Sequence, residues 1–286
     1  MKRLTMLVVA AVLTTSLAAC SDDPPPVDDG RTVLAPGDGT PHSHTTFVGD
    51  GTTADAGGYR LTDLRFPTVA RAPADLSFRI VDSSGEPVVD YAEEQTKLLH
   101  LYVVRDDLAD FRHLHPTLGP DGTWTARVDL TDPGQYRVIA EFLPVDEERN
   151  PDGDHVILGQ RALLAGEAPA VPEAPSRVAT DGLVTIEAPE TLPAGEDTQF
   201  DFTVSDGAGG VLNLGTYLGS YAHVTGFDTA TGAFVHAHPL GAPTVTDAGS
   251  ELTFHTALGT PGTYRFFVQV RVDGFVHTVP LQTTVA

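Results

Sequence analysis

The chain has 286 residues, with 17 Lys and Arg against 39 Asp and Glu, which gives a formal net charge of −22 at pH 7. This acidic excess opposes binding to nucleic acid or to an anionic membrane surface. Hydrophobic residues make up 41% of the chain, which suits a globular core, while 28 Gly and 22 Pro indicate many turns. The length predicts about two domains.

Residues 1–20 have the pattern of a bacterial secretion signal. Two basic residues precede an apolar run over residues 7–17, which is too short for a stable membrane span. The sequence Leu-Ala-Ala-Cys at residues 17–20 resembles the lipobox of bacterial lipoprotein signal peptides, whose cysteine is lipidated and becomes the mature N-terminus. The resemblance implies lipidation of Cys20 and anchoring to the outer face of the bacterial cell membrane. An ordinary signal peptide is the alternative.

Residues 21–57 form an acidic segment rich in Pro, Gly and Thr, with few residues to bury. This composition predicts a disordered tether between the membrane and the body of the protein. All sulfur-containing residues, Met1, Met6 and Cys20, belong to the signal. A metal in the mature body would therefore be bound by imidazole and oxygen rather than by sulfur.

The remainder of the chain is an internal duplication, with copies expected at residues 58–165 and 178–286. A Pro- and Ala-rich linker, residues 166–177, separates them. The best-matching segments read DPGQYRV at residues 132–138 and TPGTYRF at residues 260–266. A Pro-Gly turn followed by Tyr resembles the tyrosine corner of immunoglobulin-like sandwiches.

The strand signals agree with that fold. Short segments of alternating character recur with turn signals every 8–12 residues, and none has sustained helical periodicity. We expect strands at residues 76–81 and 123–130 in the first copy and at residues 200–204 and 251–258 in the second. The predicted fold class is all-β, with two tandem immunoglobulin-like antiparallel β-sandwiches of seven strands each after the disordered tether.

Each copy contains the template His, twelve residues, His, one residue, His, Pro. Residues i and i+2 of a strand face the same way, and the proline favours extended backbone before it. Alignment from the tyrosine corner, with six residues inserted, places a fourth histidine in each copy. The predicted metal ligands are His100, His113, His115 and His155 in the first copy and His223, His236, His238 and His277 in the second, with His255 as an additional candidate.

Two or three imidazoles on adjacent strands suit copper(II) or zinc(II). Since neutral imidazole is the binding form, we expect the affinity to fall as the pH drops through about 6.5. The alternative is a structural role. His100 lies in an apolar strand, where it could simply satisfy backbone groups, and duplication of one structural motif would also produce both sets.

The run HLYVVRDDLADFRHLHP at residues 100–116, followed by DGTW and PGQYRV, resembles a group of uncharacterised secreted or lipid-anchored proteins of actinobacterial type. Proteins of this group have duplicated immunoglobulin-like His-x-His-Pro domains and are loosely associated with extracytoplasmic copper handling. The resemblance covers about residues 58–286. It implies an extracytoplasmic location and the fold described above.

Together these features predict a lipid-anchored extracytoplasmic protein that binds copper(II), or zinc(II), for buffering or delivery beside a metal transporter or another envelope protein. The alternative is a non-catalytic envelope scaffold with structural histidines. We do not expect an enzyme, because the chain has no Gly-x-Ser-x-Gly elbow, phosphate loop or His-Glu-x-x-His motif. Cu/Zn superoxide dismutase is the nearest enzymatic alternative, but a single cysteine cannot form its intramolecular disulfide.

Overall fold

The computed structural model describes residues 46–146 and 148–286, which belong to one compact unit. The expected signal, the lipidation site Cys20 and residues 21–45 of the expected tether lie outside the described residues. All regular structure in the described part is β-strand. None of its segments is a helix with the length and apolar character needed to span a membrane.

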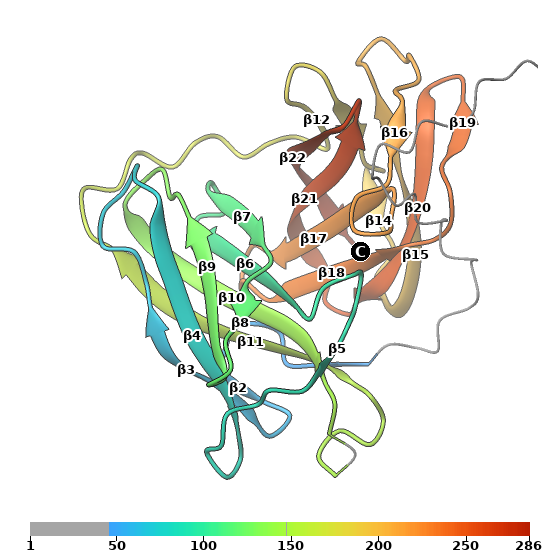
Figure 1. The fold of residues 1–286 in the computed structure, drawn as a ribbon. Helices are drawn as coiled ribbons and strands as arrows, with labels where there is room; N and C mark the ends of the chain where they lie inside the picture. Colours follow the sequence, from blue (N-terminus) through green and yellow to red (C-terminus); the bar gives the residue numbers. More distant parts are fainter. Residues whose placement is uncertain (1–45, 147) are drawn as a thin grey trace, which may run out of the picture. The chain divides into compact units, whose positions relative to one another are not determined.

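Copy one is a sandwich of two sheets (Figure 1). One sheet has the order β1-β11-β10-β6-β7, with β5 paired to β10, and the other has the order β2-β3-β4-β9-β8. Its strands are β1 (Phe47–Val48), β2 (Asp55–Ala56), β3 (Tyr59–Arg65), β4 (Ala74–Asp82), β5 (Tyr91–Ala92), β6 (Leu99–Arg105), β7 (Phe111–Leu114), β8 (Thr117–Leu118), β9 (Thr123–Val128), β10 (Gly134–Pro144) and β11 (His155–Leu164).

Copy two repeats this arrangement, but its strands form one continuous path, β12-β13-β15-β20-β18-β17-β21-β22-β14. The path is continuous because β18 pairs with β17 in one layer and, through His238 and Pro239, with β20 in the other. The strands are β12 (Val178–Thr180), β13 (Thr185–Glu187), β14 (Thr191–Leu192), β15 (Gly195–Ser205), β16 (Leu214–Gly215), β17 (Ala222–Asp228), β18 (Phe234–Pro239), β19 (Thr244–Thr246), β20 (Gly249–Leu258), β21 (Gly262–Val272) and β22 (Phe275–Val285).

The tyrosine corner is confirmed in both copies. The hydroxyl of Tyr136 donates to the carbonyl of Asp132 at 2.7 Å, and the hydroxyl of Tyr264 donates to that of Thr260 at 2.9 Å. Each bond pins the Pro-Gly turn to the strand that follows it. The all-β, tandem immunoglobulin-like fold predicted from the sequence is therefore present.

Strands β6 and β17 are buried along their whole length, which explains the nearly continuous apolar sequence of β6. One face of β6, with Leu99, Leu101 and Val103, packs in the core of copy one. Because successive side chains alternate between faces, His100 points the other way, with Tyr102 and Val104. In a strand buried on both faces, a histidine needs partners from outside its own sandwich core.

Three details differ from the expected fold. In the described residues each copy has eleven strands rather than seven, because several are pairings of only two or three residues. Strands β1 and β2 lie within residues 46–57, a segment expected to belong to the disordered tether. Strand β1 pairs with β11, so that Phe47 lies opposite His155. This pair is parallel, as is the pair of β14 with β22, so neither sandwich is purely antiparallel. Backbone hydrogen bonding to a sheet edge orders residues whose composition alone indicates no core.

Candidate metal centre

The two copies contact each other through the faces that carry the histidines. An apolar cluster separate from the two sandwich cores contains Tyr102 and Ile139 of copy one and Phe227 and Phe267 of copy two. The rings of Phe111 and Phe267 stack with their centroids 4.1 Å apart and their planes at 7°. The outward faces of β6 and β17 are therefore buried against each other, and their histidines share one interface.

Three histidines of copy one form a compact group, the copy-one triad: His100, His113 and His115. One ring nitrogen from each lies within 4.8 Å of the others, and His100 Nδ1 is 3.0 Å from His113 Nε2. Their ring centroids are 5.2, 5.2 and 4.8 Å apart. With metal–nitrogen bonds of about 2.0–2.1 Å, a tetrahedral ion places ring centroids about 5.2 Å apart. The spacing of this triad fits such an ion.

The outer nitrogens of the copy-one triad are fixed by other residues. His100 Nε2 lies 3.0 Å from the carbonyl oxygen of Glu94, and His113 Nδ1 lies 2.7 Å from Oε1 of Gln269 in copy two. The amide of Gln269 donates to Thr278 at 3.1 Å, which orients its oxygen towards His113. His115 Nε2 is buried and has no hydrogen-bond partner among the described residues. His100 Nδ1 and His113 Nε2 thus face each other, and His115 Nε2 is a third nitrogen that could act as a ligand.

The equivalent histidines of copy two, His223, His236 and His238, are called the copy-two triad and use the same nitrogens, but in the described residues only the copy-one triad brings three ligand nitrogens within 4.8 Å of one another. His223 Nε2 lies 2.7 Å from the carbonyl oxygen of Tyr217, and His236 Nδ1 lies 2.6 Å from Oε1 of Glu141 in copy one. Within the described chain, His223 Nδ1 and His238 Nε2 are buried without a partner. The rings of His236 and His238 are 4.9 Å apart. Copy two thus has two buried ring nitrogens without a partner in the described residues, and copy one has one.

Glu141 is a buried carboxylate at the centre of the interface. It accepts hydrogen bonds from His236 and, at 3.0 Å, from the hydroxyl of Tyr102. Burial by itself raises the pKa of Glu141, but the charge and hydrogen bond of His236 overcome this and hold that pKa well below its ordinary value. Burial likewise opposes the charged form of His236, yet Glu141 raises the pKa of His236. The two side chains form a buried ion pair.

The other triad histidines have lowered pKa values, chiefly because burial disfavours the imidazolium. The pKa falls to about 3 for His115, His223 and His238. The pKa values of His100 and His113 are also lowered, by burial and by neighbouring histidines. These imidazoles are therefore neutral at pH 7, which is the form that binds metal ions.

Two further candidate ligands border the copy-two triad. The ring of His155 lies 6.5 Å from that of His238, and its Nε2 is 3.8 Å from a carboxylate oxygen of Glu94. His255 is 5.6 Å from His238, ring to ring, and its Nδ1 lies 3.5 Å from Asp197. His155, a copy-one residue, thus lies beside the triad of copy two.

His277 is not the structural equivalent of His155. In copy two a two-residue turn places His277 opposite Val270, whereas the corresponding position of copy one, Phe142, faces Val156. The alignment of the two histidines is therefore wrong by one residue. Since a shift of one residue moves a side chain to the other face of its sheet, His277 and His155 face opposite ways. His277 Nδ1 instead lies 2.6 Å from a carboxylate oxygen of Asp181.

Sequence reasoning missed Glu141, Gln269 and Phe47. Glu141 and Gln269 occupy equivalent positions five residues beyond the corner tyrosines, and a polar residue in an otherwise apolar strand was the available signal. The ring of Phe47 lies 5.5 Å from His155 and 5.6 Å from His238. No local pattern marks Phe47, because it reaches the site through pairing with β11.

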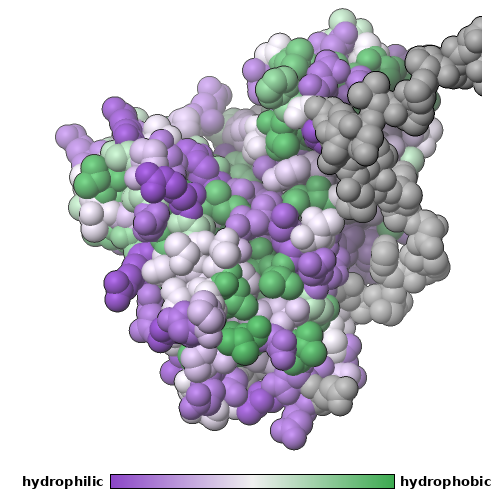
Figure 2. All heavy atoms as spheres, viewed as in Figure 1, coloured by the Kyte–Doolittle hydropathy of each residue, from purple (hydrophilic) through white to green (hydrophobic). Residues whose placement is uncertain are grey.

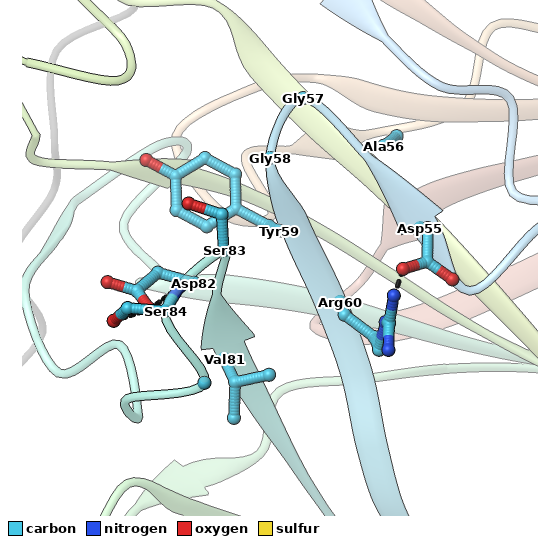
Figure 3. Close-up of a pocket in the computed structure, with 11 residues that line it drawn as sticks. Asp55, Ala56, Gly57, Gly58, Tyr59, Arg60, Val81, Asp82, Ser83 and Ser84 are labelled. Carbon is cyan, nitrogen blue, oxygen red and sulfur yellow. Dashed lines mark hydrogen bonds and ion pairs between the residues drawn. The ribbon is translucent and has the colours of Figure 1, made fainter.

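The remaining surface shows no comparable concentration of ligand groups in the described residues. On the face shown in Figure 2, hydrophobic residues are interspersed with hydrophilic ones. A shallow hollow is lined by the β2–β3 hairpin, residues 55–60, and by residues 81–85 (Figure 3). Its carboxylates have partners, since Asp55 pairs with Arg60 and Asp82 accepts from Ser84.

Several solved structures with tandem β-domains resemble the chain at low identity. A tetra-tandem repeat from the extending region of a large adhesion protein is 14% identical, with a TM-score of 0.27, and the match covers 80% of this chain and 49% of that one. The chain thus spans about half the length of that structure. The fibronectin(III)-like modules of Clostridium thermocellum CbhA are 15% identical, with 79% and 93% coverage and a TM-score of 0.18. At these identities the likeness concerns the fold alone.

No curated protein matches the sequence. A family described as a domain of unknown function, DUF8832, matches residues 52–151 and residues 177–286. The first segment spans β2 to β10 of copy one and the second spans all strands of copy two, and together they cover more than half of the chain. The chain belongs to the DUF8832 family and contains two copies of its domain.

Proposed function

We propose that this protein binds a divalent transition-metal ion, copper(II) or zinc(II), through the histidine triads at the interface of its two copies. The observation that carries this proposal is the approach of His100 Nδ1 to His113 Nε2 at 3.0 Å. The outer nitrogen of each ring faces an oxygen acceptor and so carries the hydrogen of the neutral imidazole. Two lone pairs then face each other across this short distance.

Facing lone pairs repel unless a cation lies between or beside them. A proton could serve, but burial lowers the pKa values of both His100 and His113 and disfavours their protonation. A metal ion meets the same need, and the buried Nε2 of His115 supplies a further ligand. Outer nitrogens held by oxygen acceptors are a regular feature of metal-ligating histidines.

The donor set favours borderline divalent ions. Imidazole nitrogens suit zinc, copper and nickel, whereas calcium and magnesium prefer oxygen. We further propose that the protein acts outside the cytoplasm, attached by lipid at Cys20, and buffers copper(II) or delivers it to a transporter or another envelope protein. The lipobox-like sequence supports the location, and the copy-one triad supports metal binding.

Titration of the chain from residue 21 onward with copper(II) or zinc(II) salts tests metal binding. We expect tight binding that is weakened strongly by the double substitution His113→Ala and His115→Ala. His277→Ala is the matched control, because His277 faces Asp181, and it should leave the binding isotherm unchanged. Equal binding by the double variant and the parent protein would refute the proposal.

A second candidate is an envelope scaffold whose histidines only stabilise the contact between copies. The hydrogen bonds from His113 to Gln269 and from His236 to Glu141 favour it, since both join the two copies. On this hypothesis the double variant would lose stability without any accompanying loss of metal binding. Thermal unfolding with and without zinc(II) separates the two candidates, because only a ligand of the folded state raises the unfolding temperature.

A further inference from the structure

One face of strand β21 in copy two lies against the β6–β7 hairpin of copy one. Alternate residues of a strand share a face, and those that share this one are Arg265, Phe267 and Gln269. Each of them is 9% exposed or less, while the intervening residues belong to the core of copy two. We call these three side chains the β21 contact face.

The first two side chains of the β21 contact face hold the turn and the start of β7. Arg265 donates to the carbonyl oxygen of Leu108, in the turn between β6 and β7, at 3.3 Å. The ring of Phe267 stacks on that of Phe111, the first residue of β7, with the centroids 4.1 Å apart. Copy two therefore fixes the hairpin of copy one at two points before the histidines are reached.

The third side chain contacts a member of the copy-one triad. Gln269 Oε1 lies 2.7 Å from His113 Nδ1, and the amide nitrogen of Gln269 donates to Thr278 at 3.1 Å. The ring of His113 also stacks on Tyr102 of its own copy, with the centroids 4.5 Å apart and the planes at 23°. Copy one thus holds the plane of this imidazole, and copy two holds its outer nitrogen.

Strand β7 has little support from its own sheet. It is the last strand in the order of that sheet, and in the described residues its only partner is β6, over four residues. Segments with few contacts of their own open most easily. The position of His113 therefore depends on the β21 contact face as well as on β6.

We propose that the copy-one triad is a composite metal site, in which copy one supplies the ligands and the β21 contact face of copy two positions them, with Gln269 as the positioning residue for His113. This inference rests on the metal-binding function proposed above. An acceptor on the outer nitrogen of a ligating histidine fixes its tautomer and its orientation. Metal binding and the docking of the two copies then strengthen each other, because coupling between two equilibria is reciprocal.

Two substitutions of Gln269 test its role. Gln269→Ala removes the acceptor, whereas Gln269→Glu retains an acceptor oxygen and, as a carboxylate, has no hydrogen to donate. The Glu variant therefore preserves the contact only if His113 Nδ1 carries the hydrogen, which is the tautomer that leaves Nε2 available to a metal ion. Gln199→Ala, at an exposed glutamine of the same copy, is the matched control.

Zinc(II) affinity is measured on the chain from residue 21 onward, with each variant shown to be folded by circular dichroism. We expect Gln269→Ala to weaken binding by about 10- to 100-fold, the usual effect of losing such a partner. Gln269→Glu should bind at least as tightly as the parent, because its negative charge attracts the cation. The control should bind as the parent does.

A third variant tests the coupling to docking. Phe267 stacks on Phe111, which is not a ligand, so a local effect on the metal ion is not expected from its loss. If docking positions the triad, Phe267→Ala should nevertheless weaken zinc(II) binding by about 2- to 30-fold, the usual range for coupling through packed side chains. A purely structural contact would lower the stability of this variant and leave the affinity of the folded protein unchanged.

The outcomes separate this inference from the function on which it rests. If the parent protein binds no zinc(II), the proposed function fails and the inference fails with it. If the parent binds and Gln269→Ala or Phe267→Ala binds equally well, only the inference is overturned. Weakening by Gln269→Glu also overturns it, because Gln269 would then be a donor to His113. Should Gln269→Ala not fold, Gln269→Glu decides by the same criterion, and undiminished binding supports the inference.

Discussion

Acidification should destabilise the metal-free protein because its buried histidines resist protonation. His115, His223 and His238 have pKa values of about 3 in the folded protein, against an ordinary value near 6.5. Between these values the unfolded chain binds more protons than the folded one, so stability falls as the pH falls. The pH window is therefore about 6.5 down to about 3.

The size of the effect follows from the same values. Lowering the pH from 7 to 5 protonates each of these histidines in the unfolded chain alone, which costs about 2 kcal/mol per residue. His236 opposes this by up to about 1 kcal/mol, because its pKa is raised and the folded protein already holds that proton. For these four histidines the net loss is about 5 kcal/mol, a large share of the usual 5–15 kcal/mol of a folded domain. The lowered pKa values of His100 and His113 act in the same direction.

Urea denaturation of the metal-free chain from residue 21 onward at pH 7, 6 and 5 measures this loss. The unfolding free energy should fall steeply over the series, and saturating zinc(II) should reduce the slope by holding the imidazoles neutral. The variant His115→Gln with His238→Gln removes two of the titrating groups and should show a shallower slope. A parent protein equally stable at pH 7 and pH 5 would refute the reasoning.

Three further predictions concern packing, the tyrosine corners and metal removal. Phe267→Ala removes a buried ring stacked on Phe111 and should cost about 3–5 kcal/mol in urea denaturation, whereas Phe275→Ala, at a ring that is 74% exposed, should cost less than about 0.5 kcal/mol. Tyr136→Phe should cost more than the roughly 1 kcal/mol of Tyr264→Phe, because the one hydroxyl hydrogen of Tyr136 is shared between the carbonyl of Asp132 and the buried carboxylate of Asp110, and equal losses would contradict this. Chelation of protein saturated at about 1,000 times its dissociation constant should remove about 4 kcal/mol of stability, measured by thermal unfolding with and without chelator.

Burial of the histidines changes the expected dependence of metal affinity on pH. The sequence alone suggests that binding weakens below about pH 6.5, the ordinary pKa of histidine. In the folded protein, burial keeps His115 and His238 neutral to much lower pH. If these histidines bind a metal ion, we therefore expect proton competition for them to begin at a lower pH.

The sequence by itself determined the fold class, the duplication and the motif that brings two histidines onto one face. These follow from local rules: alternation along strands, the Pro-Gly-Tyr corner, and the spacing of His113 with His115 or His236 with His238. It also assigned each copy its own site, with His155 and His277 as counterparts. That equivalence depended on the strand register. An error of one residue paired His155 with a histidine, His277, that points to the opposite face of its sheet.

Tertiary structure decided that the two sets of histidines lie in one interface, and that Glu141 and Gln269 accept hydrogen bonds from histidines of the opposite copy. No local pattern carries this information, because both contacts join residues more than 90 positions apart in the chain. The duplicated sequence shows what each copy contains. The packing of β6 and β10 against β17 and β21 shows why β6 is buried on both faces. One face lies in the core of copy one, and the face with His100 lies against copy two.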